Sequence, residues 1–185
     1  MQKPVRIAIV MALAVLVAVS SEATTARELS TEAMTAEATA IVSGRCTSIQ
    51  TVWSGRVLVT MATIRVSDRL KGDSAETITV ALPGGIDANR RFPVSMLYPG
   101  APQIATGEDV FLFLAPNAAV GGSLAVVGFS QGKFSIVNDE RGEKVVSRNL
   151  SAISLQSPAG TRRGTSARVP LDQFRNEIRR FLGQR

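Results

Sequence analysis

The sequence predicts a mainly β protein, with a short helix before the strands and an amphipathic helix at the C-terminal end. Three observations favour this fold class. Apolar and polar residues alternate with a period of two in successive runs between residues 39 and 148, as in half-buried strands. Turn signals rich in Gly, Pro and Asp separate these runs. After residue 169 the apolar residues adopt the spacing of a helix.

The first 23 residues have the pattern of a secretory signal peptide. Lys3 and Arg6 precede an unbroken apolar run over residues 7–19, and small residues follow it. The run is shorter than the roughly 20 residues that a membrane-spanning helix needs, which favours a cleaved signal over an uncleaved anchor. No cysteine lies near the expected cleavage region, which argues against a lipid-anchored lipoprotein. The protein is therefore expected to be secreted, and to act in the periplasm or outside the cell.

Length and composition fit a single domain. The chain has 185 residues, of which 162 follow position 23, and 45% of it is hydrophobic, which is ample for one packed core. Cys46 is the only cysteine, so no intrachain disulfide can form and stability is expected to come from sheet packing. In an alternating run, such a cysteine is most simply a small buried residue. The alternative is a reactive or intermolecularly paired thiol.

The net charge of +6 is unevenly distributed along the chain. Residues 24–148 hold 12 Lys and Arg against 12 Asp and Glu, whereas residues 149–185 hold seven Arg against Asp172 and Glu177. The simpler interpretation of the basic part is a solvated tail, and the alternative is contact with anionic lipid or another acidic surface. Nucleic acid is an unlikely partner, because the predicted strand region is neutral.

A short helix is expected at the start of the β region. Residues 27–37 contain good helix formers, with Ser30 or Thr31 as the N-cap and Glu32 in the first turn. This segment therefore leads into the first strand.

Three strands are expected before the middle of the chain. Each is an alternating run, and the turn signals Ser54-Gly55 and Lys71-Gly72-Asp73 separate them. Gly44 interrupts the first run and marks the expected position of a β-bulge. The three runs are residues 39–51, 56–70 and 76–82.

The segment between residues 83 and 107 is the least regular part of the chain. Its prolines, at positions 83, 93, 99 and 102, exclude a central strand at those points, although a short edge strand around residues 90–96 fits the pattern. A connection of this length inside a compact domain is usually functional or disordered.

Four further strands are expected after this segment, and the most apolar of them, residues 109–114, is expected to be central. A hairpin turn at residues 139–142 joins the last two. The other three strands are residues 124–129, 133–138 and 143–148. Residues 149–168 are rich in Ser, Gly, Ala and Arg and are interpreted as a flexible linker. The predicted organisation is a signal peptide at 1–23, a β domain at 24–148, a linker at 149–168 and a basic helix at 169–185.

The C-terminal helix carries one apolar stripe flanked by arginines. Pro170 suits its first turn. The stripe contains Leu171, Phe174, Ile178, Phe181 and Leu182. One interpretation is a helix that docks on the β domain through this stripe, and the other is a helix that lies on a membrane or in the groove of a partner. In the second case the contact residues would be Phe174, Arg175, Ile178, Arg179 and Phe181.

Two short motifs resemble catalytic signatures. Residues 128–132 match the G-x-S-x-G nucleophile elbow around Ser130, but that mechanism needs a following helix and a histidine, and the chain has no histidine. Ser130 and Lys133 also match S-x-x-K, which requires both residues on one helical face, whereas a strand pattern follows here. Both matches are interpreted as accidental, and no catalytic residue is predicted.

No metal or cofactor is expected from the residue types present. The chain lacks histidine, and its acidic residues lack the spacing of a calcium loop. What remains is a candidate binding surface in the irregular segment, where basic, aromatic and flexible apolar side chains gather as at interface cores. Its residues are Arg90, Arg91, Phe92, Met96 and Tyr98. The alternative is a loop that buries its own Phe and Met.

The order of these strands and turns resembles a known group of proteins. The strand at residues 40–46, a long strand ending in Arg69-Leu70-Lys71-Gly72-Asp73, and the patterns at 107–114 and 131–134 are similar to small secreted bacterial proteins of unknown function. More distantly, they resemble the netrin-like domain of tissue metalloproteinase inhibitors. The resemblance covers about residues 38–138 and implies a small, partly open antiparallel barrel of the oligonucleotide/oligosaccharide-binding (OB) type. Those inhibitors chelate zinc through a Cys at the mature N-terminus, which this chain lacks, so their mechanism is not carried over.

The sequence therefore predicts a secreted, non-enzymatic binding module whose partner is an envelope or extracellular protein. The alternative is an envelope-associated protein that docks on an anionic membrane surface through its C-terminal helix. A serine hydrolase that uses Ser130 is the weakest of the three hypotheses.

Overall fold

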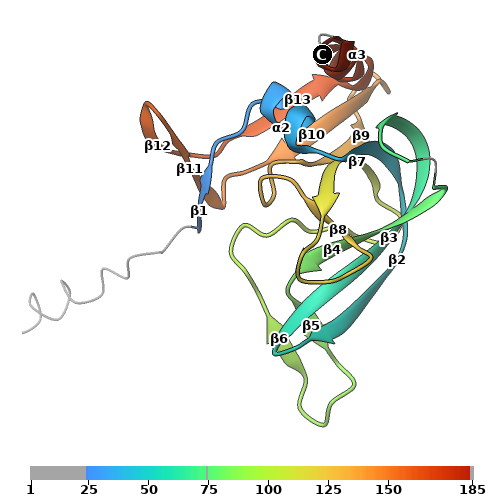
Figure 1. Ribbon diagram of the computed structural model, residues 1–185, viewed down its shortest axis with the longest axis vertical. Helices are drawn as coiled ribbons and strands as arrows, with labels where there is room; N and C mark the ends of the chain where they lie inside the picture. The colour runs from blue at the N-terminus through green and yellow to red at the C-terminus, as the bar shows by residue number, and fades with distance from the viewer. Residues whose placement is uncertain (1–23, 74, 184–185) are drawn as a thin grey trace, which may run out of the picture.

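The computed structural model describes residues 24–73 and 75–183, and it is mainly β, as the sequence predicts (Figure 1). The predicted signal peptide lies outside the described residues. The strands are β1 (Thr24–Arg27), β2 (Ala40–Ser54), β3 (Val57–Lys71), β4 (Thr77–Pro83), β5 (Gly85–Asp87), β6 (Val94–Met96), β7 (Asp109–Pro116), β8 (Leu124–Val126), β9 (Lys133–Asn138), β10 (Lys144–Asn149), β11 (Ile153–Ser157), β12 (Gly160–Arg163) and β13 (Ser166–Pro170). The helices are α2 (Thr31–Glu37) and α3 (Leu171–Gly183). Neither of these described helices is long and apolar enough to span a membrane.

The main sheet has the strand order β13-β10-β9-β7-β2-β3-β4-β8. Strand β8 also pairs with β7, so β2, β3, β4, β8 and β7 follow one another around a ring. The ring is partly open, because β4 and β8 meet at a single residue pair, Val80 with Leu124. Strand β7 lies between β2 and β9, which confirms its expected central position.

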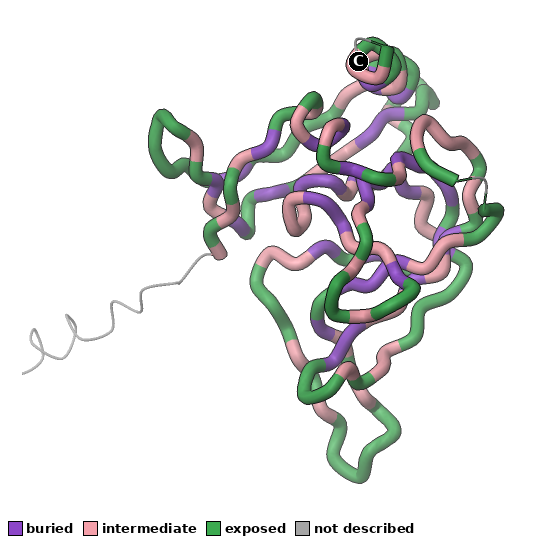
Figure 2. Tube along the Cα trace, in the orientation of Figure 1, coloured by how far each residue is buried: buried purple, intermediate pink, exposed green. Residues whose placement is uncertain are grey.

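The hydrophobic core lies on both faces of this curved sheet, because side chains alternate along each strand. Inside the ring, Val110, Leu112 and Leu114 of β7 pack with residues of β2, β3 and β4. On the opposite face, Phe111 and Phe113 pack against the two helices. Figure 2 shows the buried residues in the upper and central parts of the molecule and mainly exposed residues at its lower end.

The two helices cover the outer face of the sheet. Ser30 is the N-cap of α2, as predicted, and its hydroxyl accepts a hydrogen bond from the Ala33 amide. In α3, Leu171, Phe174 and Ile178 are buried against the sheet, so the apolar stripe is docked on the β domain. This is the first of the two arrangements considered for this helix.

The segment expected to be a flexible linker, residues 149–168, is instead folded. It contains β11, β12 and the start of β13, and β1, β11 and β12 form a separate three-stranded sheet. Leu150, Ile153 and Leu155 form a small core of their own. The linker prediction was wrong because these strands are short, and β11 and β13 pair with β1 and β10, which lie outside the segment.

The basic C-terminal part is also tied to the domain by ion pairs. Arg162 pairs with Glu28, and Arg175 pairs with Asp68. These two arginines are therefore bound to acidic residues of the neutral part of the chain, rather than belonging to a solvated tail.

Strands β2 and β3 are the longest in the molecule, and their lower halves project beyond the main sheet (Figure 1). The register of the pair shifts between Ser43 and Gly44, where the β-bulge was predicted. Strand β7 pairs with β2 only over residues 40–45. From Thr47 to Ser54, β3 is thus the only described strand beside β2. We call the projecting part, residues 47–61, the arm.

Candidate functional site

Part of the irregular segment expected to carry a binding surface folds over the arm, and we call this part, residues 84–96, the flap. Its strands β5 and β6 pair with each other, not with the main sheet. The Trp53 indole nitrogen donates to Asp87 Oδ2 at 2.8 Å, and the Arg90 guanidinium carbon lies 4.7 Å from the Trp53 ring centroid. Arg90 also forms an ion pair with Asp87 at 3.0 Å. This three-residue contact is therefore one of those that hold the flap on the arm.

The charge state of Asp87 follows from this contact. The hydrogen bond from Trp53 is the largest influence on the pKa of Asp87, and it lowers that pKa together with the Asn89 amide and Arg90, against a smaller opposing effect of burial. Asp87 is thus a carboxylate at neutral pH and accepts the hydrogen bonds that hold the flap.

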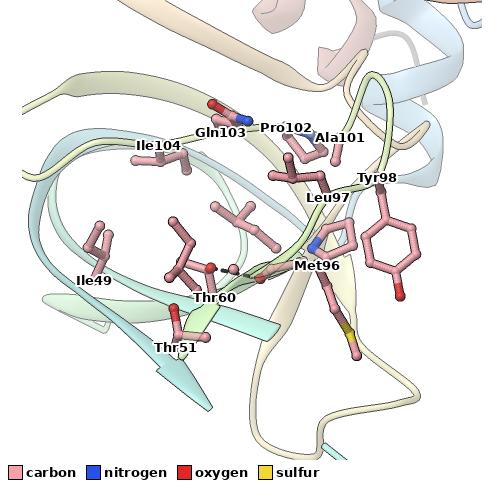
Figure 3. A pocket seen from close by; sticks show the side chains of 15 residues that line it. Ile49, Thr51, Thr60, Met96, Leu97, Tyr98, Ala101, Pro102, Gln103 and Ile104 are labelled. Atoms are coloured by element: carbon pink, nitrogen blue, oxygen red, sulfur yellow. Dashed lines mark hydrogen bonds between the residues drawn. The ribbon is translucent and has the colours of Figure 1, made fainter. Parts of the chain in front are cut away.

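A pocket of about 330 Å³ opens between the arm and the chain that follows the flap (Figure 3). Ile49 and Thr51 of β2 and Thr60 of β3 lie on one side, and Pro102, Gln103 and Ile104 lie opposite. The remaining lining residues are Leu82, Pro83, Gly84, Gly85, Ile86, Met96, Leu97, Tyr98 and Ala101. Most of the lining is apolar, and its polar side-chain groups are the hydroxyls of Thr51, Thr60 and Tyr98 and the amide of Gln103.

Two consecutive glycines allow the flap to approach the arm this closely. Gly84 has φ +90°, and a Cβ there would lie 2.5 Å from the Met96 carbonyl oxygen. Gly85 has φ +148°, and a Cβ there would lie 2.7 Å from side-chain atoms of Thr51 and Thr60. The Thr60 hydroxyl donates to the Gly84 carbonyl at 2.8 Å. A side chain at either position would therefore displace the flap.

The mouth of the pocket is surrounded by exposed large apolar side chains. Leu97, which lines the pocket, is 77% exposed, whereas Phe92, which is 76% exposed, lies on the flap outside the lining. Ile49, Ile86 and Tyr98 are also exposed. An exposed apolar group of this kind, gathered around a pocket, is typical of a site for another molecule.

The five predicted surface residues lie on the flap or directly after it, in different roles. Met96 is partly buried, and its sulfur accepts a hydrogen bond from the Leu58 amide at 3.2 Å. Arg90 holds the flap, Tyr98 lines the pocket, and the Arg91 guanidinium lies 5.6 Å from the exposed Phe92 ring. The alternative of a loop that buries its own Phe is wrong for Phe92.

The sequence analysis did not identify Ile49 and Ile104 as part of this site. Ile49 occupies an apolar position of an alternating strand, which predicts a buried side chain, yet it lies on the arm beyond the main core. The one signal present was the number of prolines between residues 83 and 102, which keeps the chain away from the sheet.

The edge of β2 beside this pocket has no strand neighbour within the described chain. The Cys46 amide donates to Glu108 O, and the Gly107 amide donates to Cys46 O, both within 2.9 Å. Apart from these two bonds, the backbone N–H and C=O groups of residues 47–54 that point away from β3 pair with no described strand. Unpaired N–H and C=O groups of this kind are a template for another extended chain.

The turn at residues 128–132 connects β8 to β9 without an intervening helix. Lys133 directs its ammonium to Glu108 at 2.6 Å and to the Ser135 hydroxyl at 2.8 Å, not to Ser130. The non-glycine residue with positive φ in this turn is Phe129, at 66°, rather than the serine. The nucleophile-elbow and S-x-x-K geometries are thus not formed around Ser130.

Cys46 is fully buried, in agreement with the simpler interpretation of this residue. Burial raises the pKa of its thiol, with a further contribution from Glu108, against the hydrogen bond it makes to Ser48 O. Within residues 24–73 and 75–183, no group of three or more His, Cys, Asp or Glu side chains is placed to hold a metal ion.

The residues considered for membrane or partner contact on α3 are not brought together on the surface. Phe174 and Ile178 are buried, Phe181 is half-buried and Arg179 is exposed. Arg175 forms its ion pair with Asp68 of β3 at 3.1 Å.

The comparisons with known proteins give no family for this chain. No protein-family description matches the sequence, and no curated protein matches it significantly.

Proposed function

We propose that this protein is a non-enzymatic binding module that holds an extended segment of another protein against the arm and the flap. The observation that carries the proposal is the coincidence of an apolar pocket, a group of exposed apolar side chains and an unpaired strand edge at one end of the molecule. A segment added to the edge of β2 gains backbone hydrogen bonds, and an apolar side chain fills the adjoining pocket.

Two exposed arginines, on the arm and on the flap, indicate the composition of that segment. Arg56 at the tip of the arm and Arg91 on the flap are exposed, and neither forms an ion pair with a described residue. Asp87, the acidic residue of the flap, is already bound by Trp53 and Arg90. The segment is therefore expected to carry apolar residues flanked by Asp or Glu.

The place of action is part of the same proposal. The signal-peptide pattern of residues 1–23 supports a partner in the periplasm or outside the cell, such as an envelope protein or an extracellular protein.

The finer fold class is also proposed, as a partly open barrel of the OB type related to netrin-like domains. Its support is the ring of five strands, β2, β3, β4, β8 and β7, with its weak closure between β4 and β8. The strand and turn patterns of about residues 38–138 support the same class.

Selection from a displayed library of linear peptides tests this function. We expect the protein to enrich peptides with apolar residues flanked by acidic ones. Leu97→Asp and Ile49→Asp should abolish capture of the selected peptides, because each places a charge in the pocket lining. Val137→Asp is the matched control, since Val137 is an exposed valine of β9 that does not line the pocket.

Two results would contradict the proposal. One is a selection without enrichment, and the other is an equal loss of capture in Val137→Asp and Leu97→Asp. Flotation with vesicles of anionic lipid tests the alternative through α3. Binding to these vesicles that survives Leu97→Asp but is lost in Arg179→Gln would favour that alternative.

A further inference from the structure

A second cavity, away from the flap, is lined mainly by polar and basic groups. Its volume is about 370 Å³. It lies where β2, β3, β7, β9 and β10 meet the first turn of α3. Its lining residues include Ser43, Arg45, Arg65, Asp109, Lys144 and Arg175. None of these lines the apolar pocket of the proposed function.

Positive charge exceeds negative charge in this cavity. Four cationic side chains line it, and the carboxylates at or beside it are those of Asp109, Asp68 and Asp172, which leaves one positive charge. Asp109 is held by Arg45 through two hydrogen bonds, of 2.8 Å and 2.6 Å. The first residue of α3, Leu171, also lines the cavity, so the positive end of this helix dipole lies nearby.

Arg45 and Arg65 face each other across the β2–β3 ladder. Like charges directly opposite on antiparallel strands are destabilising unless an anion lies between them. Arg45 is compensated by Asp109, but Arg65 forms no hydrogen bond or ion pair with a described side chain. The β-bulge at Gly44 fixes this register, since a Cβ at that position would lie 2.2 Å from the Arg65 carbonyl oxygen.

Unused hydrogen-bonding groups lie at the same place. The Nε atom of Arg175 is buried and has no partner among the described residues. Ser43 is 2% exposed, and its hydroxyl oxygen accepts a long hydrogen bond from Arg175 at 3.4 Å. No described group accepts the proton of this hydroxyl. Buried donors of this kind normally have an acceptor, in the protein or in a bound molecule.

We propose that this cavity binds a phosphoryl anion, either free phosphate or the phosphate group of a small phosphomonoester. A phosphate anion supplies negative charge where positive charge is in excess, and it offers acceptors to Arg65, Arg175 and Ser43. Planar guanidinium groups form paired hydrogen bonds with such oxygens. The volume of the cavity leaves space for an organic substituent beside the phosphate. The site is independent of the proposed binding of a protein segment.

Titration of the full chain with inorganic phosphate, followed by NMR of the backbone amides, tests this site. Sodium chloride at the same ionic strength is the control for screening. We expect saturable shifts confined to residues 43–47, 65–67 and the start of α3. A parallel titration with glycerol phosphate distinguishes the two forms of the ligand. Tighter binding of the ester indicates a phosphorylated small molecule, and equal binding indicates free phosphate.

Arg65→Gln is the decisive variant, because the Arg65 side chain makes no contact that the fold needs. We expect it to weaken phosphate binding about tenfold, the effect of losing one charge-assisted hydrogen bond. The matched control is Arg141→Gln, in the exposed turn between β9 and β10. In phosphate-free buffer, Arg65→Gln should also melt at a higher temperature than the natural protein, since it removes the repulsion with Arg45.

Phosphate shifts no larger than those of chloride would overturn the proposal. An equal loss of affinity in Arg141→Gln and Arg65→Gln would overturn it too, because binding would then reflect net charge only. An unchanged affinity for phosphate in Arg65→Gln would also overturn the proposal.

Discussion

At the scale of single residues, Gln131 fixes the N-terminal segment to the sheet. Its side chain is 1% exposed. Its Nε2 donates to Arg27 O at 2.7 Å and to Gly128 O at 3.1 Å, and its Oε1 accepts from the Leu29 amide at 2.8 Å. The Gln131 amide thus bonds to the backbone of residues 27 and 29 and to that of residue 128, and so joins two segments that lie far apart in the sequence.

We expect Gln131→Ala to lower the free energy of unfolding by about 1–3 kcal/mol, the cost of leaving buried polar groups unsatisfied. Urea denaturation measures this loss. Gln173→Ala, at an exposed position of α3, is the control and should change stability by less than about 0.5 kcal/mol. Equal effects of the two substitutions would show that the three hydrogen bonds of Gln131 do not stabilise the fold.

Arg148, which is half-buried, is the second polar residue at this contact. Its Nη1 donates to Gln131 O at 2.7 Å, and its guanidinium carbon lies 4.7 Å from the centre of the Phe134 ring. Burial lowers the pKa of Arg148, which Glu28 partly opposes. Neither Gln131 nor Arg148 could be predicted from the sequence as a structural residue. Their roles depend on contacts with residues about a hundred positions away.

At the scale of elements, α3 is held by aromatic packing. The Phe174 ring centroid lies 5.2 Å from that of Phe111, 6.1 Å from that of Phe113 and 4.8 Å from that of Phe134. Three strand residues therefore surround one helix residue, and the helix buries its stripe within the same core as the sheet.

We expect Phe174→Ala to destabilise the protein by about 3–5 kcal/mol, because it leaves a cavity among three rings. Phe181→Ala provides a matched control of the same chemistry at a half-buried position of the same helix, and a much smaller loss is expected there. Thermal or urea unfolding measures both. If the two variants unfolded alike, the docking of α3 would contribute little to stability.

The sequence predicted well the elements that their own residue pattern identifies, without reference to their partners. Alternation over six or more residues predicted β2, β3, β4, β7, β9 and β10 within one or two residues at most ends, and the apolar stripe predicted α3. Strands β11, β12 and β13 were missed because short polar strands depend on their partners. All four residues of β12, for example, are exposed.

The two sites also differ in how far the sequence predicts them. The flap was predicted as a binding surface from its composition, but the pocket beneath it depends on how the arm projects. The basic cavity could not be predicted, because the meeting of Arg45 with Arg65 depends on register shifts in the β2–β3 pair. Such shifts follow from the folded backbone rather than from any local pattern.

At the scale of the whole molecule, the free energy of unfolding should decrease in acid, because four carboxylates have lowered pKa values. Hydrogen bonds from Arg162, Trp53 and Arg45 have the largest effect on Glu28, Asp87 and Asp109, respectively. In Glu108, burial by itself would raise the pKa, but hydrogen bonds from Lys133, Ser135 and the Ala105 amide outweigh it. A carboxylate with a lowered pKa stabilises the fold above its unfolded pKa, and this stabilisation is lost as pH falls through the folded value.

We therefore expect the urea midpoint to fall as pH decreases below about 4.5, the ordinary pKa of a glutamate. Glu108→Gln should be less stable than the natural protein at neutral pH, and the difference should shrink in acid. Glu140→Gln, in the exposed turn after β9, is the control and should leave the pH profile unchanged. A difference between Glu108→Gln and the natural protein that stays constant with pH would contradict this assignment.

The pairing of β1 with β11 has a consequence for the order in which the molecule is assembled. Thr24 pairs with Ile153 in a parallel register, so the first described strand has no partner until nearly the whole chain has been synthesised. Contacts between such distant residues form late, because a long loop must close first. The N-terminal segment should therefore stay unattached while the β2–β3 hairpin and its neighbours fold. Its docking would then be the step that completes the molecule.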